Sequence, residues 1–202
     1  VALTIPNQKK GRLNKRQLHK IPQDRNDLFK IKIVQDDKQL DVCLLVDESG
    51  SMGHHYMSHA RQSCIAVKEA LQGNDKLNLW VFGHTADQNE RGATEMYEYA
   101  SPSMRDRPLG CGAMRARYEN RDGTAILASA ERVKGQSDHP WADKLMIIFS
   151  DGAPSADGYR GSSAHKHTAK MVKKVDGMGY SVIQVGFGGW AHRGQSDMFT
   201  NS

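Results

Sequence analysis

The sequence predicts an α/β fold, in which a doubly wound, mostly parallel sheet carries helices on both of its faces. Two apolar runs, at residues 42–46 and 145–149, are continuous rather than alternating, which is typical of strands buried on both faces. Further apolar runs alternate along the chain with segments whose apolar residues recur every three or four positions. Such alternation favours parallel strands joined by helical crossovers.

The first half of the predicted sheet begins with a buried strand at 41–47. A helix over 54–72 follows, because its apolar residues fall on one side, at steps of three and four. These residues are Met57, Ala60, Cys64, Val67 and Leu71. Gly73 is a common kind of residue at a helix end. Residues 77–82 are then the second strand, and 96–99 predict a short third strand at a sheet edge.

The second half begins with a segment that lacks clear periodicity, 101–121, which predicts a long loop with some helical turns. A helix begins at Thr124, a central strand spans 144–150, a helix spans 164–178 and a fifth strand spans 181–185. After Gly186 the chain turns polar and glycine-rich, so either the protein continues beyond Ser202 or the last helix is absent. We therefore predict one domain at 41–202, with or without its last helix.

The first forty residues are predicted to be a basic extension of that domain. Residues 1–40 hold ten Lys or Arg and four Asp, a net charge of +6 that leaves −1 for the remainder. Basic arms often bind nucleic acid or acidic partners. Here Phe29 is a lone aromatic among the basic residues, which favours a solvated lead-in over nucleic-acid binding. Residues 28–34 alternate and predict a strand able to add to a sheet edge.

Cysteine usage and hydropathy indicate a cytoplasmic protein. Of the three cysteines, Cys43 and Cys64 fall at predicted buried positions, as small core residues rather than disulfide partners. Reduced cysteines are typical of the cytoplasm. No apolar run approaches the roughly 20 residues that span a bilayer, so no membrane partner is expected. The start of the chain does not resemble a secretory signal.

Three polar segments are predicted to meet at one edge of the sheet. The pattern Asp47-x-Ser49-x-Ser51 follows the first buried strand, Asp151 follows the strand at 144–150, and Thr124 opens a helix. The carboxyl ends of neighbouring parallel strands converge on one crevice, and alternate residues of an extended chain point the same way. Carboxylates and hydroxyls are hard oxygen ligands, which suit Mg2+, with Mn2+ or Ca2+ as substitutes. The predicted metal ligands are Asp47, Ser49, Ser51, Thr124 and Asp151.

These five residues resemble the metal-ion-dependent adhesion motif of von Willebrand factor A domains, and the resemblance spans residues 40–188. It implies a Rossmann-like domain in which Ser49, Ser51 and Thr124 contact Mg2+ directly. Asp47 and Asp151 would bind mostly through ordered waters. The resemblance also implies that an Asp or Glu of a partner protein completes the metal's coordination shell. In the closed form of such domains, Thr124 lies further from the metal and Asp151 nearer.

A narrower resemblance concerns Ser150-Asp151-Gly152-Ala153-Pro154 and the lead-in from 11–14 to 29–30. Both are similar to the A-domain region of the CobT-type subunit of aerobic cobaltochelatase. In that family the A domain works with an AAA+ ATPase, and the complex inserts cobalt into a corrin ring. Related pairs remodel other targets. The resemblance implies a non-catalytic subunit that binds an AAA+ ATPase, an acidic protein ligand, or both.

Two other functions stay open on the residues alone. Mg2+ near Asp47, Asp151 and His84 would suit a phosphoesterase, and the metal site by itself would suit a cell-surface adhesin. The chain has no Gly-x-Ser-x-Gly nucleophile motif and no Gly-x4-Gly-Lys-Ser/Thr phosphate loop. Any ATPase therefore has to be a separate protein.

Several further side chains are expected near the predicted site. His54, His55 and His84 are expected at its rim, and Glu48 on the opposite side of the strand. An arginine cluster either recognises an acidic partner or is simply solvated. Its members are Arg105, Arg107, Arg115, Arg117 and Arg121. His55 and His59 stand four apart on a predicted helix, but no third residue with zinc-like spacing joins them.

Overall fold

The computed structural model describes residues 2–9, 12–15, 29–34, 39–104 and 110–188. The chain divides into two compact units, Val1–Asp37 and Lys38–Ser202. The sequence left open whether a last helix follows, and the residues after 188 lie outside the described part of the chain. No helix in the described part is long and apolar enough to cross a membrane.

The first unit is a three-stranded antiparallel sheet in the order β1-β3-β2. Its strands are β1 (Ala2–Gln8), β2 (Arg12–Leu13) and β3 (Phe29–Val34). The strand predicted at 28–34 is confirmed, and its neighbours in the sheet are β1 and β2. The expectation of a solvated lead-in overlooked β1, whose Leu3 and Ile5 lie opposite Ile33 and Ile31. Leu3 and Ile5 stand two residues apart, which is the side-chain period of a β-strand.

The second unit contains a five-stranded sheet in the order β6-β5-β4-β7-β8. Its strands are β4 (Leu40–Asp47), β5 (Leu77–Ala86), β6 (Thr94–Ala100), β7 (Asp143–Ser150) and β8 (Tyr180–Gly186). All neighbours are parallel except β6, which pairs antiparallel with β5 at one edge. The central strand is β4, between β5 and β7. The predicted α/β fold with a mostly parallel sheet is therefore confirmed.

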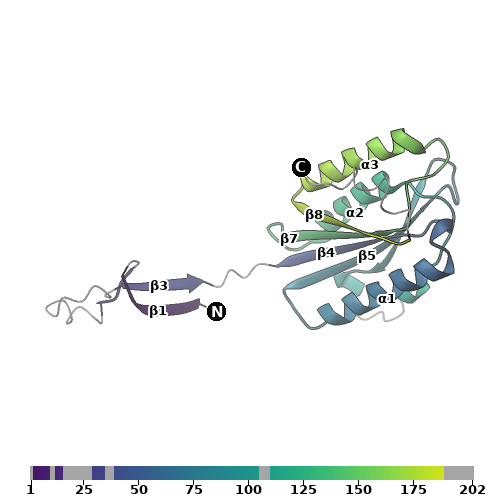
Figure 1. The fold of residues 1–202 in the computed structure, drawn as a ribbon. Helices are drawn as coiled ribbons and strands as arrows, with labels where there is room; N and C mark the ends of the chain where they lie inside the picture. The colour runs from purple at the N-terminus through teal and green to yellow at the C-terminus, as the bar shows by residue number, and fades with distance from the viewer. Residues whose placement is uncertain (1, 10–11, 16–28, 35–38, 105–109, 189–202) are drawn as a thin grey trace. The chain divides into compact units, whose positions relative to one another are not determined.

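Helices cover both faces of this sheet, as predicted. Figure 1 shows α1 (Gly53–Leu71) on one face and α2 (Asp122–Gln136) with α3 (Gly161–Asp176) on the other. Alternate side chains of β4 point to opposite faces. Leu44 and Val46 therefore join the cluster under α1, whereas Cys43 and Leu45 join the cluster under α2 and α3. The predicted apolar stripe of the first helix faces its cluster.

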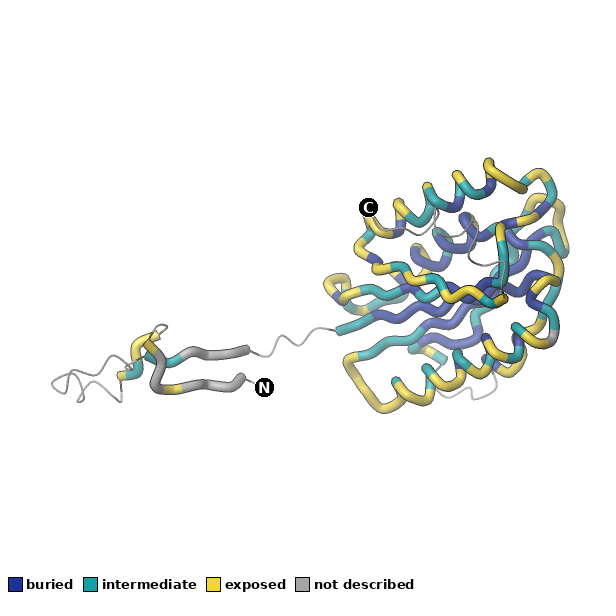
Figure 2. The backbone as a smooth tube through the Cα atoms, viewed as in Figure 1, coloured by how far each residue is buried: buried dark blue, intermediate teal, exposed yellow. Residues whose placement is uncertain are grey.

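The interior of the unit is concentrated around β4 and β5, which are dark blue in Figure 2 except at their amino ends. Trp80 is fully buried and donates from Nε1 to Gln136 Oε1 at 2.8 Å. Cys43, Cys64 and Cys111 are buried and free, so the prediction that the first two are core residues is confirmed. Burial raises the pKa of the Cys43 thiol to about 12. The thiol of Cys43 therefore stays protonated at neutral pH.

The loop predicted at 101–121 contains two helical turns among its described residues. They are the short helices at Pro102–Met104 and Cys111–Ala113. Buried Cys111 and Met114 anchor the second turn in the cluster under α1. This anchor brings the following residues, 115–121, back toward the carboxyl end of the sheet, where their backbone bonds to Glu48, Gly50 and Ala86.

Candidate metal centre

The predicted metal ligands come from the carboxyl ends of two neighbouring strands and the start of one helix. Asp47 is the last residue of β4, and Ser150, the last residue of β7, immediately precedes Asp151. Because β4 and β7 pair in parallel, these two ends lie at the same edge of the sheet. The short helix Gly50–Met52 then turns the chain into α1.

The carboxylate of Asp47 is fully buried and held by three donors. Its Oδ1 accepts a hydrogen bond from the backbone N–H of Ser49 at 2.8 Å. Its Oδ2 accepts from Asn120 Nδ2 at 3.0 Å and from the Ser150 hydroxyl at 3.2 Å. Asp47 therefore fixes the loop that carries Ser49, and its own position is fixed by residues on two other segments.

Two serine hydroxyls and one carboxylate form a chain beside Asp47. The hydroxyl oxygens of Ser49 and Ser51 lie 3.0 Å apart, and the Ser51 hydroxyl donates to Asp151 Oδ1 at 2.9 Å. The structure thus brings four of the five predicted residues together. Thr124, the third residue of α2, is exposed, and its hydroxyl forms no hydrogen bond with the other four in the described part of the chain.

Negative charge accumulates at this edge, and among the described residues no Lys or Arg forms an ion pair with Asp47, Asp122 or Asp151. Burial raises the pKa of Asp47. Burial, together with the negative charge of Asp47, raises the pKa of Asp151 and raises that of Asp122 well above its usual range. His84 Nε2 lies 3.8 Å from Asp122 Oδ1, but burial lowers the pKa of His84 to about 4, so it is neutral at pH 7. The side chains favour a cation between them.

His84 is not a rim residue, contrary to the expectation from the sequence. It is 1% exposed, and its Nδ1 is buried without a hydrogen-bond partner among the described residues. The reason is that β5 extends to Ala86 rather than ending near residue 82, so His84 pairs beside Asp47 inside the sheet. A buried neutral imidazole without access to solvent does not suit the general base of a phosphoesterase.

Asn120 and Asp122 belong to this centre but were missed by the sequence analysis. The amide of Asn120 donates to Asp47 Oδ2 and to Asp122 Oδ1, at 3.0 and 3.1 Å. Its Oδ1 accepts from the backbone N–H of Ser155 at 2.7 Å. Asn120 therefore joins β4, the start of α2 and the loop after β7. The available signal is the spacing of two polar residues, Asn120 and Asp122, at the start of the helix.

Glu48 faces away from the predicted ligands, as expected. Its carboxylate is fully buried and accepts from Arg117 Nε and from the Tyr99 hydroxyl, each at 2.5 Å. The Arg117 guanidinium also stacks over the Tyr97 ring, 3.9 Å from its centroid. Gly83 is required beside this pair, since a Cβ there would lie 2.6 Å from Glu48 Oε1.

Two members of the arginine cluster predicted from the sequence are engaged inside the domain. Arg117 pairs with Glu48, and Arg121 pairs with Asp87 at 3.3 Å. Arg115 is exposed, whereas Arg105 and Arg107 lie outside the described residues. His55 is exposed on α1, and the side chain of His54 lies outside the described residues.

Tyr159, His167 and Thr168 pack together behind the first turn of α2. The hydroxyl of Tyr159 lies 2.8 Å from His167 Nδ1 and 3.1 Å from Thr168 Oγ1. These groups contact Gly123, where an added Cβ would lie 2.6 Å from His167 Nδ1 and 2.9 Å from the Tyr159 hydroxyl. The position of Thr124 therefore depends on the absence of a side chain at Gly123.

We expect Asp122→Asn to stabilise the metal-free domain at pH 7 by on the order of 1 kcal/mol. The folded-state pKa of Asp122 is raised above the usual 3.8. Its protonated form therefore supports folding at low pH, and that stability is lost as the pH rises through the folded-state pKa. Urea unfolding in EDTA between pH 4 and 8 measures the difference, which should grow with pH. Asp138→Asn, at an exposed position, is the control; a pH-independent difference would contradict the prediction.

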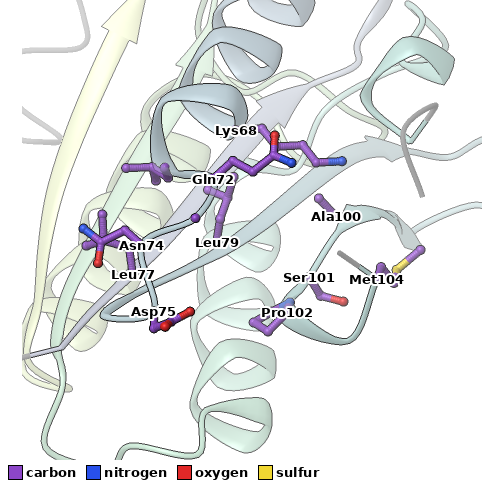
Figure 3. A pocket seen from close by; sticks show the side chains of 12 residues that line it. Lys68, Gln72, Asn74, Asp75, Leu77, Leu79, Ala100, Ser101, Pro102 and Met104 are labelled. Carbon is purple, nitrogen blue, oxygen red and sulfur yellow. The ribbon is translucent and has the colours of Figure 1, made fainter. Parts of the chain in front are cut away.

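A cavity of about 340 Å³ (Figure 3) lies at the end of the sheet opposite to the candidate metal centre. It is bounded by the end of α1, the start of β5 and the segment after β6, including Lys68, Leu77 and Met104. These segments lie at the amino end of β5, whereas the candidate metal centre lies at the carboxyl ends of β4 and β7. The cavity is therefore separate from the centre.

Comparison with known proteins shows which domains share this architecture. The model of the von Willebrand factor type A domain matches residues 41–199. The uncharacterized protein YojO of Bacillus subtilis (strain 168) is 28% identical over 185 residues, which cover 87% of this chain and 28% of YojO.

Several solved structures are similar in fold at low sequence identity. The pilus adhesin SpaC of Lactobacillus rhamnosus GG has a TM-score of 0.62 at 16% identity, covering 83% of this chain and 28% of SpaC. Manganese-loaded TRAP protein of Plasmodium vivax has a TM-score of 0.58 at 17% identity, covering 80% of this chain and 63% of TRAP. The chain thus spans less than a third of YojO and SpaC. Since the family model covers most of its length, this protein belongs to the von Willebrand factor type A domain family.

Proposed function

We propose that this domain is a Mg2+-dependent protein-binding module that grips an acidic residue of a partner protein. Domains of this family typically serve in protein interaction or adhesion. The proposal adds the metal ion, its ligands and the kind of partner. The ligands proposed are Asp47, Ser49, Ser51, Thr124 and Asp151.

The observation that carries the proposal is the line of oxygens from Ser49 through Ser51 to Asp151, beside buried Asp47. All of these donors are hard oxygens, which suit Mg2+. Beside the effect of burial, the charge of Asp47 raises the pKa of Asp151 and of Asp122, and no Lys or Arg among the described residues pairs with them. A divalent cation would remove this repulsion, so the donor set fits the ion.

Within this scheme the residues have different tasks. Ser49 and Ser51 are neutral donors, and Thr124 is exposed at the start of α2, where it is accessible to an ion. Asp47 is already engaged by Ser49, Asn120 and Ser150, so it acts by holding the loop. Neutral hydroxyl ligands leave the cation with much of its charge. That charge favours one carboxylate from outside, which is the chemistry of an Asp or Glu on a partner.

We further propose that the partner is an AAA+ ATPase or its protein target, in a cobaltochelatase-like or remodelling complex in the cytoplasm. Support comes from the resemblance of residues 150–154 and of the lead-in to the CobT-type subunit. Three free, buried cysteines agree with a reducing compartment. The domain would transmit motion of the ATPase rather than carry out bond chemistry.

Loss of a ligand should abolish metal binding while the fold survives. We expect Asp151→Asn to weaken Mg2+ binding at least tenfold in calorimetric titration, because it removes a charged oxygen ligand. The fold should survive, because Asp151 is only half-buried and its side chain bonds to Ser51 near the surface. Asp138→Asn, on the exposed surface, is the matched control and should bind as the wild type does. Equal Mg2+ affinity in Asp151→Asn and in the control would refute the metal site.

Partner capture tests the second half of the proposal. The domain is used as bait in cell lysate, in Mg2+ and in EDTA, beside Asp151→Asn, and bound proteins are identified by mass spectrometry. An AAA+ ATPase held only by the wild type in Mg2+ is the expected result. If the same proteins were captured in Mg2+ and in EDTA, and by the wild type and Asp151→Asn, the proposed role of the cation would be contradicted. Turnover of phosphodiesters would then be measured.

A further inference from the structure

Two histidines on the exposed side of α1 face each other. His55 and His59 stand one helical turn apart, and both are exposed. Their Nε2 atoms lie 3.3 Å apart, with ring centroids at 4.6 Å and ring planes at 85°. Residues four apart lie on the same face of a helix, which brings the two rings together.

The distance between the two nitrogens matches that of a shared metal ion. Zinc binds histidine nitrogen at about 2.0–2.1 Å in tetrahedral sites, so two such nitrogens stand about 3.3–3.4 Å apart. The observed 3.3 Å falls in this range. One ring donates a hydrogen bond to the other across this distance, and a bound ion would take the place of the shared proton. Both Nε2 lone pairs can therefore point at one ion without movement of the backbone.

We propose that His55 and His59 bind a zinc-class divalent ion through their Nε2 atoms. Imidazole nitrogen suits Zn2+, Cu2+ and Ni2+, whereas Mg2+ prefers oxygen. The pair is therefore a second metal site, chemically distinct from the oxygen-lined centre at the end of β4. Its two ligands belong to one rigid helix, so the geometry exists before the ion arrives.

The site has open coordination positions. In the described part of the chain, no group of three or more His, Cys, Asp or Glu side chains could hold a metal ion. The remaining positions on the ion are therefore available to water or to a side chain of another protein. His55 lies in the first turn of α1, which follows directly from the loop that carries Ser51. An ion here would extend the binding face of the domain along α1.

Zinc titration of the intact chain tests the proposal. Calorimetry with ZnCl2 in saturating Mg2+, so that the oxygen-lined centre is not the site measured, should show one Zn2+ bound per chain. His55→Gln and His59→Gln should each weaken this binding at least tenfold. His165→Gln is the matched control, because His165 also lies on a helix but has Ala169 one turn later. Thermal unfolding in EDTA should be the same for all variants, since both rings are exposed.

A second readout identifies the ligating atom. Ligation through Nε2 leaves the proton on Nδ1, which nitrogen-15 NMR of the imidazoles reports directly. The expected result is that Zn2+ shifts the Nε2 signals of two histidines in the wild type and of none in the double variant. Absence of Zn2+ binding, or loss of binding in His165→Gln equal to that in His55→Gln, would overturn the proposal. Retained Zn2+ binding in Asp151→Asn would show that the two metal sites are independent.

Discussion

Replacing Glu48 with alanine is expected to lower the free energy of unfolding by about 3–5 kcal/mol. Glu48 is fully buried and the Arg117 side chain is only 10% exposed. Removing the carboxylate leaves the guanidinium without its partner in a site where water cannot replace it. Burial and Glu48 also raise the pKa of Tyr99, whose hydroxyl stays a donor and would lose its acceptor as well.

The same change should loosen the loop that carries the proposed metal ligands. The backbone N–H of Arg117 donates to the Glu48 carbonyl at 2.6 Å, and Gly50 N–H donates to the Tyr118 carbonyl at 2.7 Å. By binding Arg117, the Glu48 side chain fixes the segment that includes Tyr118. The backbone of that segment in turn holds Gly50, which lies between Ser49 and Ser51. We expect weaker Mg2+ binding in Glu48→Ala, in addition to lower stability.

Urea unfolding followed by circular dichroism measures this effect. The control is Glu119→Ala, which removes an ion pair with Arg160 whose side chains are 64% and 39% exposed. An exposed pair of this kind contributes about 0–1 kcal/mol. A Glu48→Ala variant as stable as Glu119→Ala would show that the buried pair does not hold the loop.

Replacing Gly123 with alanine is expected to destabilise the domain by about 1–3 kcal/mol, the usual cost of overpacking. The new methyl group would lie 2.6 Å from His167 Nδ1 and 2.9 Å from the Tyr159 hydroxyl. Either these side chains or the first turn of α2 must move. Movement of α2 displaces Thr124, so Mg2+ affinity should fall together with stability.

Gly135→Ala on the same helix is the matched control, and its effect should have the opposite sign. No atom lies within 4 Å of a Cβ at Gly135. Alanine within a helix is favoured over glycine by about 1 kcal/mol or less, so this variant should gain stability. Thermal unfolding and Mg2+ titration of both variants give the comparison. If Gly123→Ala also gained stability and kept its Mg2+ affinity, close packing behind α2 would not position the centre.

The fold could be predicted because its signals are local. The continuous apolar runs at 42–46 and 145–149 became the paired interior strands β4 and β7. The three-to-four residue spacing from Met57 to Leu71 became the buried face of α1. In the first unit, by contrast, β1 was overlooked because the basic residues around it dominated the interpretation. Its apolar signal, Leu3 and Ile5, is short.

The shell around the proposed ligands could not be predicted in the same way. Asn120 is connected to Asp47 across 73 positions of the chain, and no spacing rule links the two. His84 was expected at the surface because the strand was expected to end four residues earlier, near residue 82. The orientation of Glu48, by contrast, was predicted correctly. Side chains alternate along an extended chain, so the residue after Asp47 points away from the ligands.

The bond between Ser51 and Asp151 joins residues 100 positions apart. In the sheet, β4 lies between β5, which follows it closely in the sequence, and β7, which follows it about a hundred residues later. A growing polypeptide therefore exposes the Asp47–Ser51 loop long before its counterpart emerges from the ribosome. Closure of so large a loop is slow compared with local helix formation. Under the proposed function, the nascent chain would therefore lack a complete set of metal ligands until β7 has docked.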